Sequence, residues 1–328
     1  MKDKKKTRLL DYLRLFSKAR ILVIGDFMLD QFVWGSVNRI SPEAPVPVVN
    51  VQRESYMPGG ALNVANNIRT LGGTVYPCGV VGRDLEGRML VKTIRREGIE
   101  TGGVIYDASR RTTLKTRIIA HSQQVVRFDR EKGDDISKED RAAMMRFIRA
   151  AIEKTDVIIV EDYGKGVIQP ALLEELLKLA RKHKKPVVVD PKEKHFSYYK
   201  GATAITPNRK EAYGAIEHSE KLPMKEVGKK LLSKLALEGV LMTLGEDGMA
   251  LFEKDGSVTQ IPTAAREVYD VSGAGDTVIS VFSMALAVGA KMKDAARISN
   301  IAAGIVVGKL GTATVTPEEL ERALRKEP

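Results

Sequence analysis

The chain has 328 residues, and its 53 lysines and arginines against 42 aspartates and glutamates give a formal net charge of +11 at pH 7. With 43% hydrophobic and 29% charged residues it can bury a large core, which excludes a disordered or fibrous protein. The single cysteine, Cys78, excludes a disulfide framework and a cysteine-rich zinc site, and four scattered histidines argue against a histidine-built metal centre.

The N-terminus is basic over residues 1–6, but no apolar run of about 7–15 residues follows, so we predict no secretory signal. No apolar stretch approaches the roughly 18 residues of a membrane span, and we expect a cytoplasmic protein that contacts no membrane. The net charge fits an anionic small substrate or a nucleic acid. Because aromatic residues make up only 5% of the chain and the other dense basic run is short (181–185), we expect no nucleic-acid partner.

Short β-branched runs alternate with longer amphipathic segments. In chain order we expect a strand at 20–25, a helix at 60–71, a strand at 74–81, helices at 84–97 and 138–154, a strand at 156–160, a helix at 170–183, strands at 186–190 and 204–206, a helix at 225–237, a strand at 240–244, and helices at 275–288 and 294–307. This alternation predicts βαβ units, and therefore an α/β fold with a mostly parallel sheet flanked by helices. No repeat or linker divides the chain, so we expect one domain over residues 1–328.

Two stretches, 31–53 and 105–130, interrupt this alternation because they are typical of strands without helices. We expect them to form a small antiparallel sheet, a lid that projects from the main domain; the alternative is an extension of the main sheet at its edge. Side chains alternate along a strand, so Lys115 and Arg117 lie on one face. Arg127 lies on the strand that returns beside it.

The strongest local motif is Gly273-Ala274-Gly275-Asp276, which opens the helix expected at 275–288. Backbone N–H groups at a glycine-rich helix start, together with the helix dipole, form an anion hole suited to a phosphoryl group. An aspartate in that turn can accept a proton from an attacking hydroxyl. Ordinary helix capping is the alternative. The motif is neither a Walker A loop nor a dinucleotide-binding fingerprint.

Two further segments carry candidate contacts to a small polar ligand. The pair Gly59-Gly60 allows close backbone approach at the start of a helix, and Asn63 in its first turn could hydrogen-bond a hydroxyl. Asp26 and Asp30 follow the first strand, and ligands bind beyond the carboxyl ends of parallel strands. The alternative for both aspartates is turn and cap chemistry.

Asn208 and Glu211 are three residues apart and therefore share a helix face. An amide and a carboxylate in this arrangement could hold Mg²⁺ through water, because Mg²⁺ keeps much of its hydration. Alternatively, Glu211 completes a capping pattern.

Together these motifs resemble those of the ribokinase-like (PfkB) carbohydrate kinases. Gly59-Gly60 with Asn63, then Asn208-x-x-Glu211, then Gly-Ala-Gly-Asp276 occur in the family's order over nearly the whole chain. More narrowly, the chain resembles the D-glycero-β-D-manno-heptose-7-phosphate kinases in segments 40–48 (ISPEAPVPV), 114–117 (LKTR), 123–130 (QQVVRFDR) and 161–166 (EDYGKG).

The resemblance implies a ribokinase-like fold and transfer of a phosphoryl group from ATP to the anomeric hydroxyl of D-glycero-β-D-manno-heptose 7-phosphate. The product, a 1,7-bisphosphate, would serve ADP-heptose synthesis for the lipopolysaccharide core. The implied ions are Mg²⁺ with ATP, and K⁺ near the loops at Asp270 and Gly311. The implied partner is a second copy paired through the lid, helped by the apolar character of residues 46–51.

The resemblance also implies roles for particular residues. Asp276 is the expected catalytic base, and the expected anion hole comprises Gly273, Ala274 and Gly275. The expected sugar contacts are Asp30, Asp26, Gly59, Gly60 and Asn63. The candidates for binding the 7-phosphate, with plain surface charge as the alternative, are Lys115, Arg117 and Arg127. The expected nucleotide contacts are Asn208, Glu211, Asp190, Lys192, Thr243, Gly245 and Gly248, with adenine near 304–311.

One spacing departs from many ribokinases: Leu62 alone separates Ala61 from Asn63, and the heptose kinases share this shorter spacing. Heptose kinases are often fused to a nucleotidyltransferase domain. The chain ends at Pro328, soon after the kinase motifs, so we expect adenylyl transfer to require a separate protein.

Two alternatives stay open at this point. The chain could be another PfkB kinase that acts on a ketose phosphate or on ribose. Of a different class is a non-catalytic nucleic-acid-binding or regulatory protein on a kinase scaffold, which only the charge of +11 suggests and which a steep salt dependence of binding would reveal.

Overall fold

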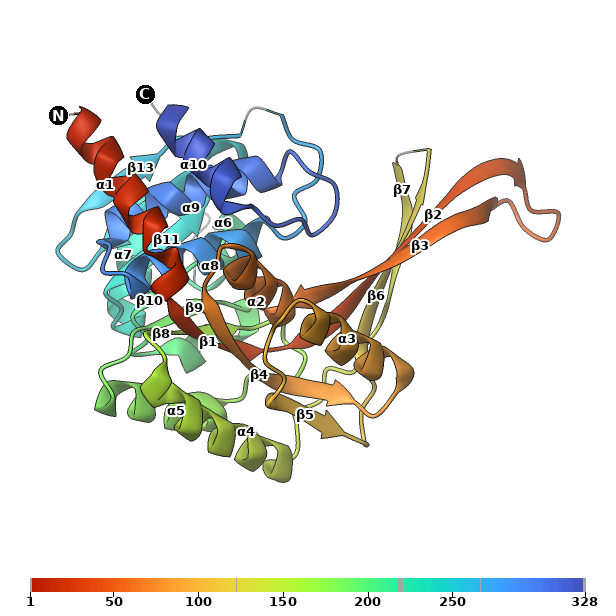
Figure 1. Ribbon diagram of the computed structural model, residues 1–328, viewed down its shortest axis with the longest axis horizontal. Helices are drawn as coiled ribbons and strands as arrows, with labels where there is room; N and C mark the ends of the chain where they lie inside the picture. Colours follow the sequence, from red (N-terminus) through yellow and green to blue (C-terminus); the bar gives the residue numbers. More distant parts are fainter. Residues whose placement is uncertain (1, 122, 218–220, 266, 327–328) are drawn as a thin grey trace.

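The computed structural model describes residues 2–121, 123–217, 221–265 and 267–326. Within these ranges the chain forms a nine-stranded sheet in the body and a four-stranded sheet that extends away from it (Figure 1). The large sheet has the strand order β13 (Val258–Ile261), β12 (Met249–Glu253), β11 (Gly239–Thr243), β10 (Ala204–Ile205), β9 (Val187–Asp190), β8 (Val157–Glu161), β1 (Arg20–Gly25), β4 (Thr74–Gly82) and β5 (Gly103–Asp107). Strands β11 to β5 are parallel, whereas β12 and β13 add antiparallel pairs at one edge.

Helices cover both faces of this sheet because its central strands are apolar on both sides. Along β1, Ile21 and Val23 belong to one buried cluster and Leu22 and Ile24 to the other, as the period of two requires. The first cluster packs against α1 (Lys2–Arg14), α2 (Ala61–Thr70), α3 (Leu85–Arg96), α8 (Ala274–Ala287), α9 (Met292–Val306) and α10 (Pro317–Lys326). The second packs against α4 (Lys138–Ala151), α5 (Pro170–Lys182), α6 (Arg209–Gly214) and α7 (Met224–Leu235).

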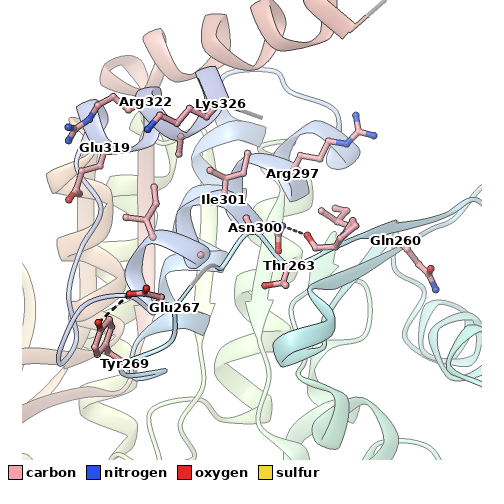
Figure 2. Close-up of a pocket in the computed structure, with 17 residues that line it drawn as sticks. Gln260, Thr263, Glu267, Tyr269, Arg297, Asn300, Ile301, Glu319, Arg322 and Lys326 are labelled. Atoms are coloured by element: carbon pink, nitrogen blue, oxygen red, sulfur yellow. Dashed lines mark hydrogen bonds between the residues drawn. The ribbon is translucent and has the colours of Figure 1, made fainter. Parts of the chain in front are cut away.

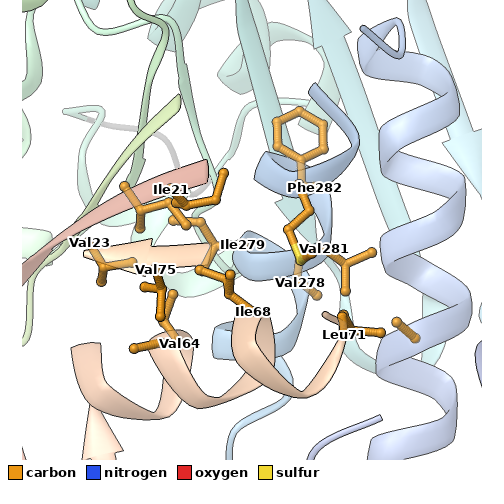
Figure 3. Close-up of a cluster of buried hydrophobic side chains, with 14 of the residues drawn as sticks. Ile21, Val23, Val64, Ile68, Leu71, Val75, Val278, Ile279, Val281 and Phe282 are labelled. Atoms are coloured by element: carbon orange, nitrogen blue, oxygen red, sulfur yellow. The ribbon is translucent and has the colours of Figure 1, made fainter. Parts of the chain in front are cut away.

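The contact between α2 and α8 fixes the centre of the first cluster. Figure 3 shows Val64 and Ile68 of α2 beside Val278 and Ile279 of α8, under the strand residue Ile21. These side chains are almost fully buried, and each contributes roughly 1.5–3 kcal/mol by leaving water. The packing therefore brings together the first turns of the two helices, on which Asn63 and Asp276 lie.

The smaller sheet, called the lid below, consists of β3 (Pro47–Gly60), β2 (Phe27–Ile40), β6 (Thr113–Ala120) and β7 (Gln123–Arg130), in that order. Its strands extend beyond the predicted segments: β2 starts at Phe27 and β3 runs to Gly60. The expectation that residues 105–107 belong to the lid is wrong, because β5 pairs with β4 in the large sheet and buries Val104.

The expected antiparallel lid is also wrong in one pair, because β2 and β6 run parallel. The reason lies in the large sheet. Strands β1 and β5 run in the same direction in the large sheet. Because β2 follows β1 and β6 follows β5 after short connections, β2 and β6 leave the large sheet in the same direction. The remaining lid pairs, β2 with β3 and β6 with β7, are antiparallel as expected.

Aromatic side chains stiffen the middle of β2. Phe32 and Trp34 stack with ring centroids 5.6 Å apart, and the Arg53 guanidinium lies 4.0 Å from the Trp34 ring centroid. On the other side, the Arg117 guanidinium lies 5.2 Å from the Phe32 ring. The stacked pair Phe32 and Trp34 therefore lies between two guanidinium groups, that of Arg53 on β3 and that of Arg117 on β6.

The predicted α/β class is confirmed, with a mostly parallel sheet flanked by helices and a small lid sheet. The strands and helices predicted for the large sheet and its flanking layers agree with the observed bounds to within one or two residues, except that the helix expected at 138–154 ends at Ala151 and continues as a 3-10 turn. The sequence interpretation did not anticipate α1, α10, β12 and β13, whereas α6 starts after Asn208 and contains Glu211, the two residues expected to share a helix face. In the described part of the chain, no helix combines the length and apolar character needed to cross a bilayer.

Candidate active site

A cavity of about 400 Å³ lies between the lid and the carboxyl ends of the parallel strands. Its walls come from lid strands, from the loops after β8 and β9, and from the start of α8. The lining residues are Met28, Asp30, Gly60, Lys115, Arg117, Arg127, Asp129, Glu131, Tyr163, Lys165, Lys192, Ser272, Gly273, Asp276 and Thr312. The structure thus brings residues from both halves of the sequence to one site.

Asp276 lies in the first turn of α8 and is only 4% exposed. The helix begins after Gly273, whose φ of 78° is left-handed and favours glycine. The Asp276 carboxylate accepts hydrogen bonds from Asn63 Nδ2 at 2.5 Å and from the Tyr163 hydroxyl at 2.9 Å. Burial raises its pKa to about 6, and the two hydrogen bonds limit that rise. The carboxylate can therefore act as a base near neutral pH.

Asp30 forms the floor of the cavity beneath the lid cations. Its Oδ1 accepts from Arg117 Nη1 at 2.6 Å, and both side chains are largely buried. A Cβ at residue 59 would collide with the Asp30 carboxylate, so Gly59 is required for this close approach. Gly60 has a φ of 57° and packs on the Asp26 carbonyl. The glycine pair thus shapes the floor, although only Gly60 lines the cavity itself.

The predicted lid cations Lys115, Arg117 and Arg127 all line the cavity. Lys115 Nζ lies 2.8 Å from Asp129, and Arg127 Nε lies 3.1 Å from the same carboxylate. These cations form ion pairs with side chains of the protein, and a ligand anion would compete with carboxylates for them.

The sequence interpretation missed a fourth cation, Lys165, in the loop after β8. Its Nζ lies 2.6 Å from Glu131, which also lies 3.5 Å from Lys115. Lys192 lines the same cavity, and its ammonium group forms no ion pair with the residues that the structure describes. The EDYGKG segment was the available signal for Lys165, but spacing alone could not direct its side chain into the cavity.

Asp26, expected to contact sugar, does not line this cavity. Its carboxylate accepts from the backbone N–H groups of Tyr163, Lys165 and Val167 at 2.8, 3.1 and 3.2 Å. Burial raises the Asp26 pKa to about 6, and these three hydrogen bonds oppose the rise. Asp26 is therefore an internal anchor for the loop after β8, which corresponds to the turn-chemistry alternative.

Asn63 is likewise displaced from its expected position. It is fully buried, donates to Asp276 and is absent from the cavity wall. Because α2, which carries Asn63, packs against α8, the Asn63 amide donates to the Asp276 side chain and does not face a ligand in the cavity. Sequence spacing gave no signal for this pairing, which joins residues 213 positions apart.

Three carboxylates, those of Glu161, Asp190 and Asp276, have oxygens within 4.8 Å of one another. Burial and the neighbouring negative charges raise the pKa of Glu161 and of Asp190 well above the usual range. Carboxylate oxygens are the ligands that Mg²⁺ prefers, and one Glu161 oxygen is buried without a hydrogen-bond partner in the structure. The cluster could therefore hold a divalent cation, a possibility that the sequence interpretation gave to other residues.

Asn208 and Glu211 form a complete capping box at the start of α6. Asn208 Oδ1 accepts from the Glu211 N–H, and Glu211 Oε2 accepts from the Asn208 N–H, both at 2.9 Å. The capping alternative is thus present in the structure. Among the described residues, Glu211 Oε1 accepts no hydrogen bond, and burial raises the Glu211 pKa. The pair could still hold a hydrated cation.

The turn after β11 carries the predicted nucleotide contacts Thr243, Gly245 and Gly248. Gly245 has a φ of 63° with open space at its Cβ position, so ligand atoms can approach its backbone. Gly248 has a φ of 84° and packs against backbone at residues 261–263. Thr243 pairs with Asn208 in an isolated bridge, which places this turn beside α6.

A second cavity, of about 850 Å³, lies between the end of β13 and helices α9 and α10. Figure 2 shows Asn300 donating to the Pro262 carbonyl at 2.8 Å, with Thr263 below it. The region predicted for adenine contributes Gly304 and Gly308 to the wall. Thr263 contacts the Gly248 turn, so the cavity adjoins the predicted nucleotide contacts.

Asp270 joins the two loops expected near K⁺. Its carboxylate accepts from the Ser272 N–H at 2.9 Å and from the Gly311 N–H at 3.0 Å. This carboxylate therefore fixes the loop before α8 against the loop before α10.

Comparison with known proteins gives consistent results. The family of pfkB carbohydrate kinases matches residues 18–319. The chain is 47% identical over 316 residues to the bifunctional protein HldE of Desulfatibacillum aliphaticivorans, covering 96% of this chain and 65% of that protein. It is 49% identical over 311 residues to HldE of Geotalea uraniireducens, covering 93% and 64% respectively. The chain thus spans less than two thirds of the length of these relatives.

Two solved structures share the fold. The ribokinase of Thermotoga maritima superposes with a TM-score of 0.72 at 22% identity, covering 94% of this chain and 100% of that one. Phosphofructokinase-2 of Escherichia coli, in complex with potassium, gives a TM-score of 0.76 at 18% identity, covering 94% and 98%. At these identities the comparison establishes the arrangement of strands and helices.

Proposed function

The chain belongs to the pfkB family of carbohydrate kinases, and we propose that it phosphorylates the anomeric hydroxyl of D-glycero-β-D-manno-heptose 7-phosphate to give the 1,7-bisphosphate. One observation carries the proposal most directly. The buried Asp276 carboxylate, at the start of α8, opens onto a cavity whose other wall carries the lid cations. A base and an anion-binding wall are the two requirements of a kinase whose acceptor is a sugar phosphate.

Asp276 is the proposed base. It takes the proton of the acceptor hydroxyl as that oxygen attacks the γ-phosphorus of ATP, and ADP leaves with the former bridging oxygen. With a pKa of about 6 the carboxylate is mostly ionised at neutral pH. The backbone amides at Gly273, Ala274 and Gly275, at the positive end of α8, would stabilise the transferring phosphoryl group.

The acceptor would lie between the lid and the start of α8. Asp30 and the Gly60 backbone would contact hydroxyl groups, and Lys115, Arg117 and Arg127 would bind the 7-phosphate. Each cation now faces a carboxylate, so phosphate binding exchanges one ion pair for another. An acceptor without phosphate would leave those pairs unchanged and would make no use of the three lid cations. The presence of three cations on this wall therefore favours a phosphorylated acceptor.

ATP would bind along the groove from the second cavity to α8. We propose that the second cavity takes adenine, that Thr243, Gly245 and Gly248 contact the nucleotide, and that Lys192 faces its phosphates. This arrangement would direct the γ-phosphoryl group toward the start of α8.

Oxygen donors that fit Mg²⁺ are present in Asp190 and Glu161 and, through water, in Asn208 and Glu211. Bound with ATP, Mg²⁺ would supply positive charge that neutralises the phosphates. We propose K⁺ as a further ion beside the loops that Asp270 joins.

The similarity to HldE proteins supports the heptose assignment. The HldE relatives are longer proteins described as bifunctional, and for this chain we propose the kinase reaction. The bisphosphate would then enter ADP-heptose synthesis for the lipopolysaccharide core in the cytoplasm.

We also propose a homodimer formed through the lid, where Val46, Val51, Val126 and Phe128 are exposed. Sedimentation of the parent and of a Val126→Ser, Phe128→Ser variant tests this. We expect a dimer that the double substitution weakens; a parent that stays monomeric at micromolar concentration contradicts it.

The test of the reaction is an ADP-release assay with Mg²⁺–ATP and a panel of acceptors. The panel comprises D-glycero-D-manno-heptose 7-phosphate, sedoheptulose 7-phosphate, fructose 6-phosphate, fructose 1-phosphate and ribose. We expect strong turnover with the manno-heptose phosphate alone. Preference for another acceptor would reject the heptose assignment, and turnover of ribose as the best substrate would also reject the phosphate role of the lid cations.

A further inference from the structure

Both oxygens of the Asp276 carboxylate are held by neutral donors from outside its own helix. Asn63 Nδ2, on α2, donates to Oδ2 at 2.5 Å, and the Tyr163 hydroxyl, in the loop after β8, donates to Oδ1 at 2.9 Å. A carboxylate can rotate about its Cβ–Cγ bond, and two donors on opposite oxygens prevent that rotation. Of the two donors only Tyr163 lines the substrate cavity.

We propose that Tyr163 is a positioning residue for the reaction, whose hydroxyl fixes the plane of the Asp276 carboxylate so that a free lone pair faces the acceptor hydroxyl. This inference rests on the proposed function, because it presupposes that Asp276 accepts the proton. In it the tyrosine neither gains nor loses a proton. The acceptor proton passes to Asp276, and the phenol remains a hydrogen-bond donor throughout.

The loop that carries Tyr163 is held on one side by Asp26. The Tyr163 N–H donates to Asp26 Oδ2 at 2.8 Å, and the N–H groups of Lys165 and Val167 donate to the same carboxylate. Because Asp26 is 1% exposed and follows β1 directly, the loop is fastened to the centre of the large sheet. The backbone of Tyr163 is thereby fixed at the point where its side chain begins.

A second buried carboxylate, that of Asp162, holds the loop from its other side. It accepts from the Gly164 N–H at 2.8 Å, from the Tyr199 hydroxyl at 2.7 Å and from His195 Nδ1 at 2.8 Å. Gly164 and Gly166 have φ values of 67° and 87°, which favour glycine. The glycine conformations and the carboxylates of Asp26 and Asp162 together fix the backbone of this short loop. The Tyr163 side chain therefore starts from a fixed position and can keep one direction.

The surroundings keep the Tyr163 hydroxyl protonated. Burial, together with the negative charges of Asp276, Glu161 and Asp190, raises its pKa well above the usual range. The residue therefore donates a hydrogen bond at any pH at which the protein works. Asp30, a further carboxylate whose charge raises the Asp276 pKa, is itself paired with Arg117.

The test compares the full-length parent with Tyr163→Phe, which keeps the ring and removes the hydroxyl. A hydrogen bond to a charged group that aligns the base has an expected effect of about 10- to 100-fold on kcat. We expect that loss with the KM for ATP and for the acceptor within about twofold of the parent. Tyr213→Phe is the matched control, because the Tyr213 hydroxyl, on α6, donates to the Leu222 carbonyl at 3.3 Å, outside the cavity that holds Asp276, and this variant should retain parental kcat.

Two kinetic outcomes overturn the proposal. A kcat within twofold of the parent means that the hydroxyl does not align the base. A raised acceptor KM at parental kcat means that Tyr163 is a substrate contact. The acceptor panel separates this failure from that of the proposed function, because parent and variant are compared with whichever acceptor the parent uses.

A structural readout covers the case in which no acceptor of the panel is turned over, which would itself reject the proposed function. Crystal structures of the parent and of Tyr163→Phe, each without ligand, compare the Asp276 side chain directly. We expect the variant carboxylate to rotate or to occupy two conformers. One unchanged conformer in the variant overturns the positioning role.

Discussion

The two walls of the candidate site hold their charged groups in different ways. On the α8 wall, Asp276 is 4% exposed, and its hydrogen-bonding partners are the neutral donors Asn63 and Tyr163. On the lid wall, Lys115 and Arg127 share the carboxylate of Asp129, and every residue of β7 is exposed. The α8 wall holds its charged group by burial and neutral hydrogen-bond donors, whereas the lid wall holds its cations by ion pairs with carboxylates.

This difference separates two tasks of a phosphoryl-transfer enzyme. A base must keep one orientation, and neutral donors in a packed site preserve both its direction and its charge. Cations that capture an anion must exchange partners, and the ion pair of the half-exposed Arg127 is weak enough to do so, whereas the Arg117–Asp30 pair is largely buried. Substitutions on the α8 wall should therefore affect kcat, and substitutions on the lid wall should affect the KM of the acceptor.

The largest expected effect is that of Asp276→Asn. The amide cannot accept the acceptor proton, so kcat should fall by about 10³-fold while ATP binding stays within a few-fold of the parent. A steady-state ADP-release assay measures kcat, and calorimetric titration with ATP measures ATP binding. Asp255→Asn, on a distant exposed turn, is the control, and a near-parental rate in Asp276→Asn would refute the base assignment.

Asp26→Ala should have the next largest effect, on stability. It leaves three N–H donors, one buried and two part-buried, without their acceptor, which should lower the free energy of unfolding by about 3 kcal/mol. Turnover should fall as well, because the Tyr163 loop loses its anchor. Urea unfolding at pH 7.5 measures the change, and a loss below about 1 kcal/mol would contradict the anchoring role.

Arg117→Ala tests the lid wall. It removes the partner of the buried Asp30 carboxylate and a cation proposed for the 7-phosphate, so the acceptor KM should rise by about 30-fold and the ATP KM much less. Steady-state kinetics with each substrate varied in turn gives both values. Arg39→Ala, exposed toward the far end of β2, is the matched control. Equal changes in the two KM values would count against a phosphate-binding role.

The pH dependence offers a smaller effect without any substitution. The Asp276 pKa is raised to about 6, so the base becomes protonated as the pH falls through that value. Below it, kcat/KM should fall about tenfold for each pH unit. A pH–rate profile from 5 to 8 with the best acceptor measures this, and a flat profile down to pH 5 would show that no such base limits the reaction.

Much of the large sheet could be predicted from sequence. The strands are short apolar runs such as 20–25, and the helices between them carry an apolar stripe, so period and length identify both. The Gly-Ala-Gly-Asp276 start of α8 was equally visible, because glycines before an aspartate at a helix start are a local signal. Strand alternation predicted that Lys115 and Arg117 share a face, and Arg127 required in addition that the following strand return beside them.

The missed features depend on contacts distant in sequence. Asp26 and Asp30 follow the same strand, yet Asp26 binds backbone N–H groups at residues 163–167 and Asp30 binds Arg117. Nothing in their local sequence separates these roles. The Asn63–Asp276 pair depends on how α2 packs against α8, and the parallel β2–β6 pair depends on the direction of β1 and β5.

Trp34 is the one tryptophan of the chain, and it lies on the lid. It stacks on Phe32, whose ring lies 5.2 Å from the Arg117 guanidinium, and Arg53 covers it at 4.0 Å. An anion that draws Arg117 away from this stack would change the surroundings of the indole. The protein therefore carries an intrinsic fluorophore at the lid side of its candidate site, so anion binding there should be observable by emission without any attached dye.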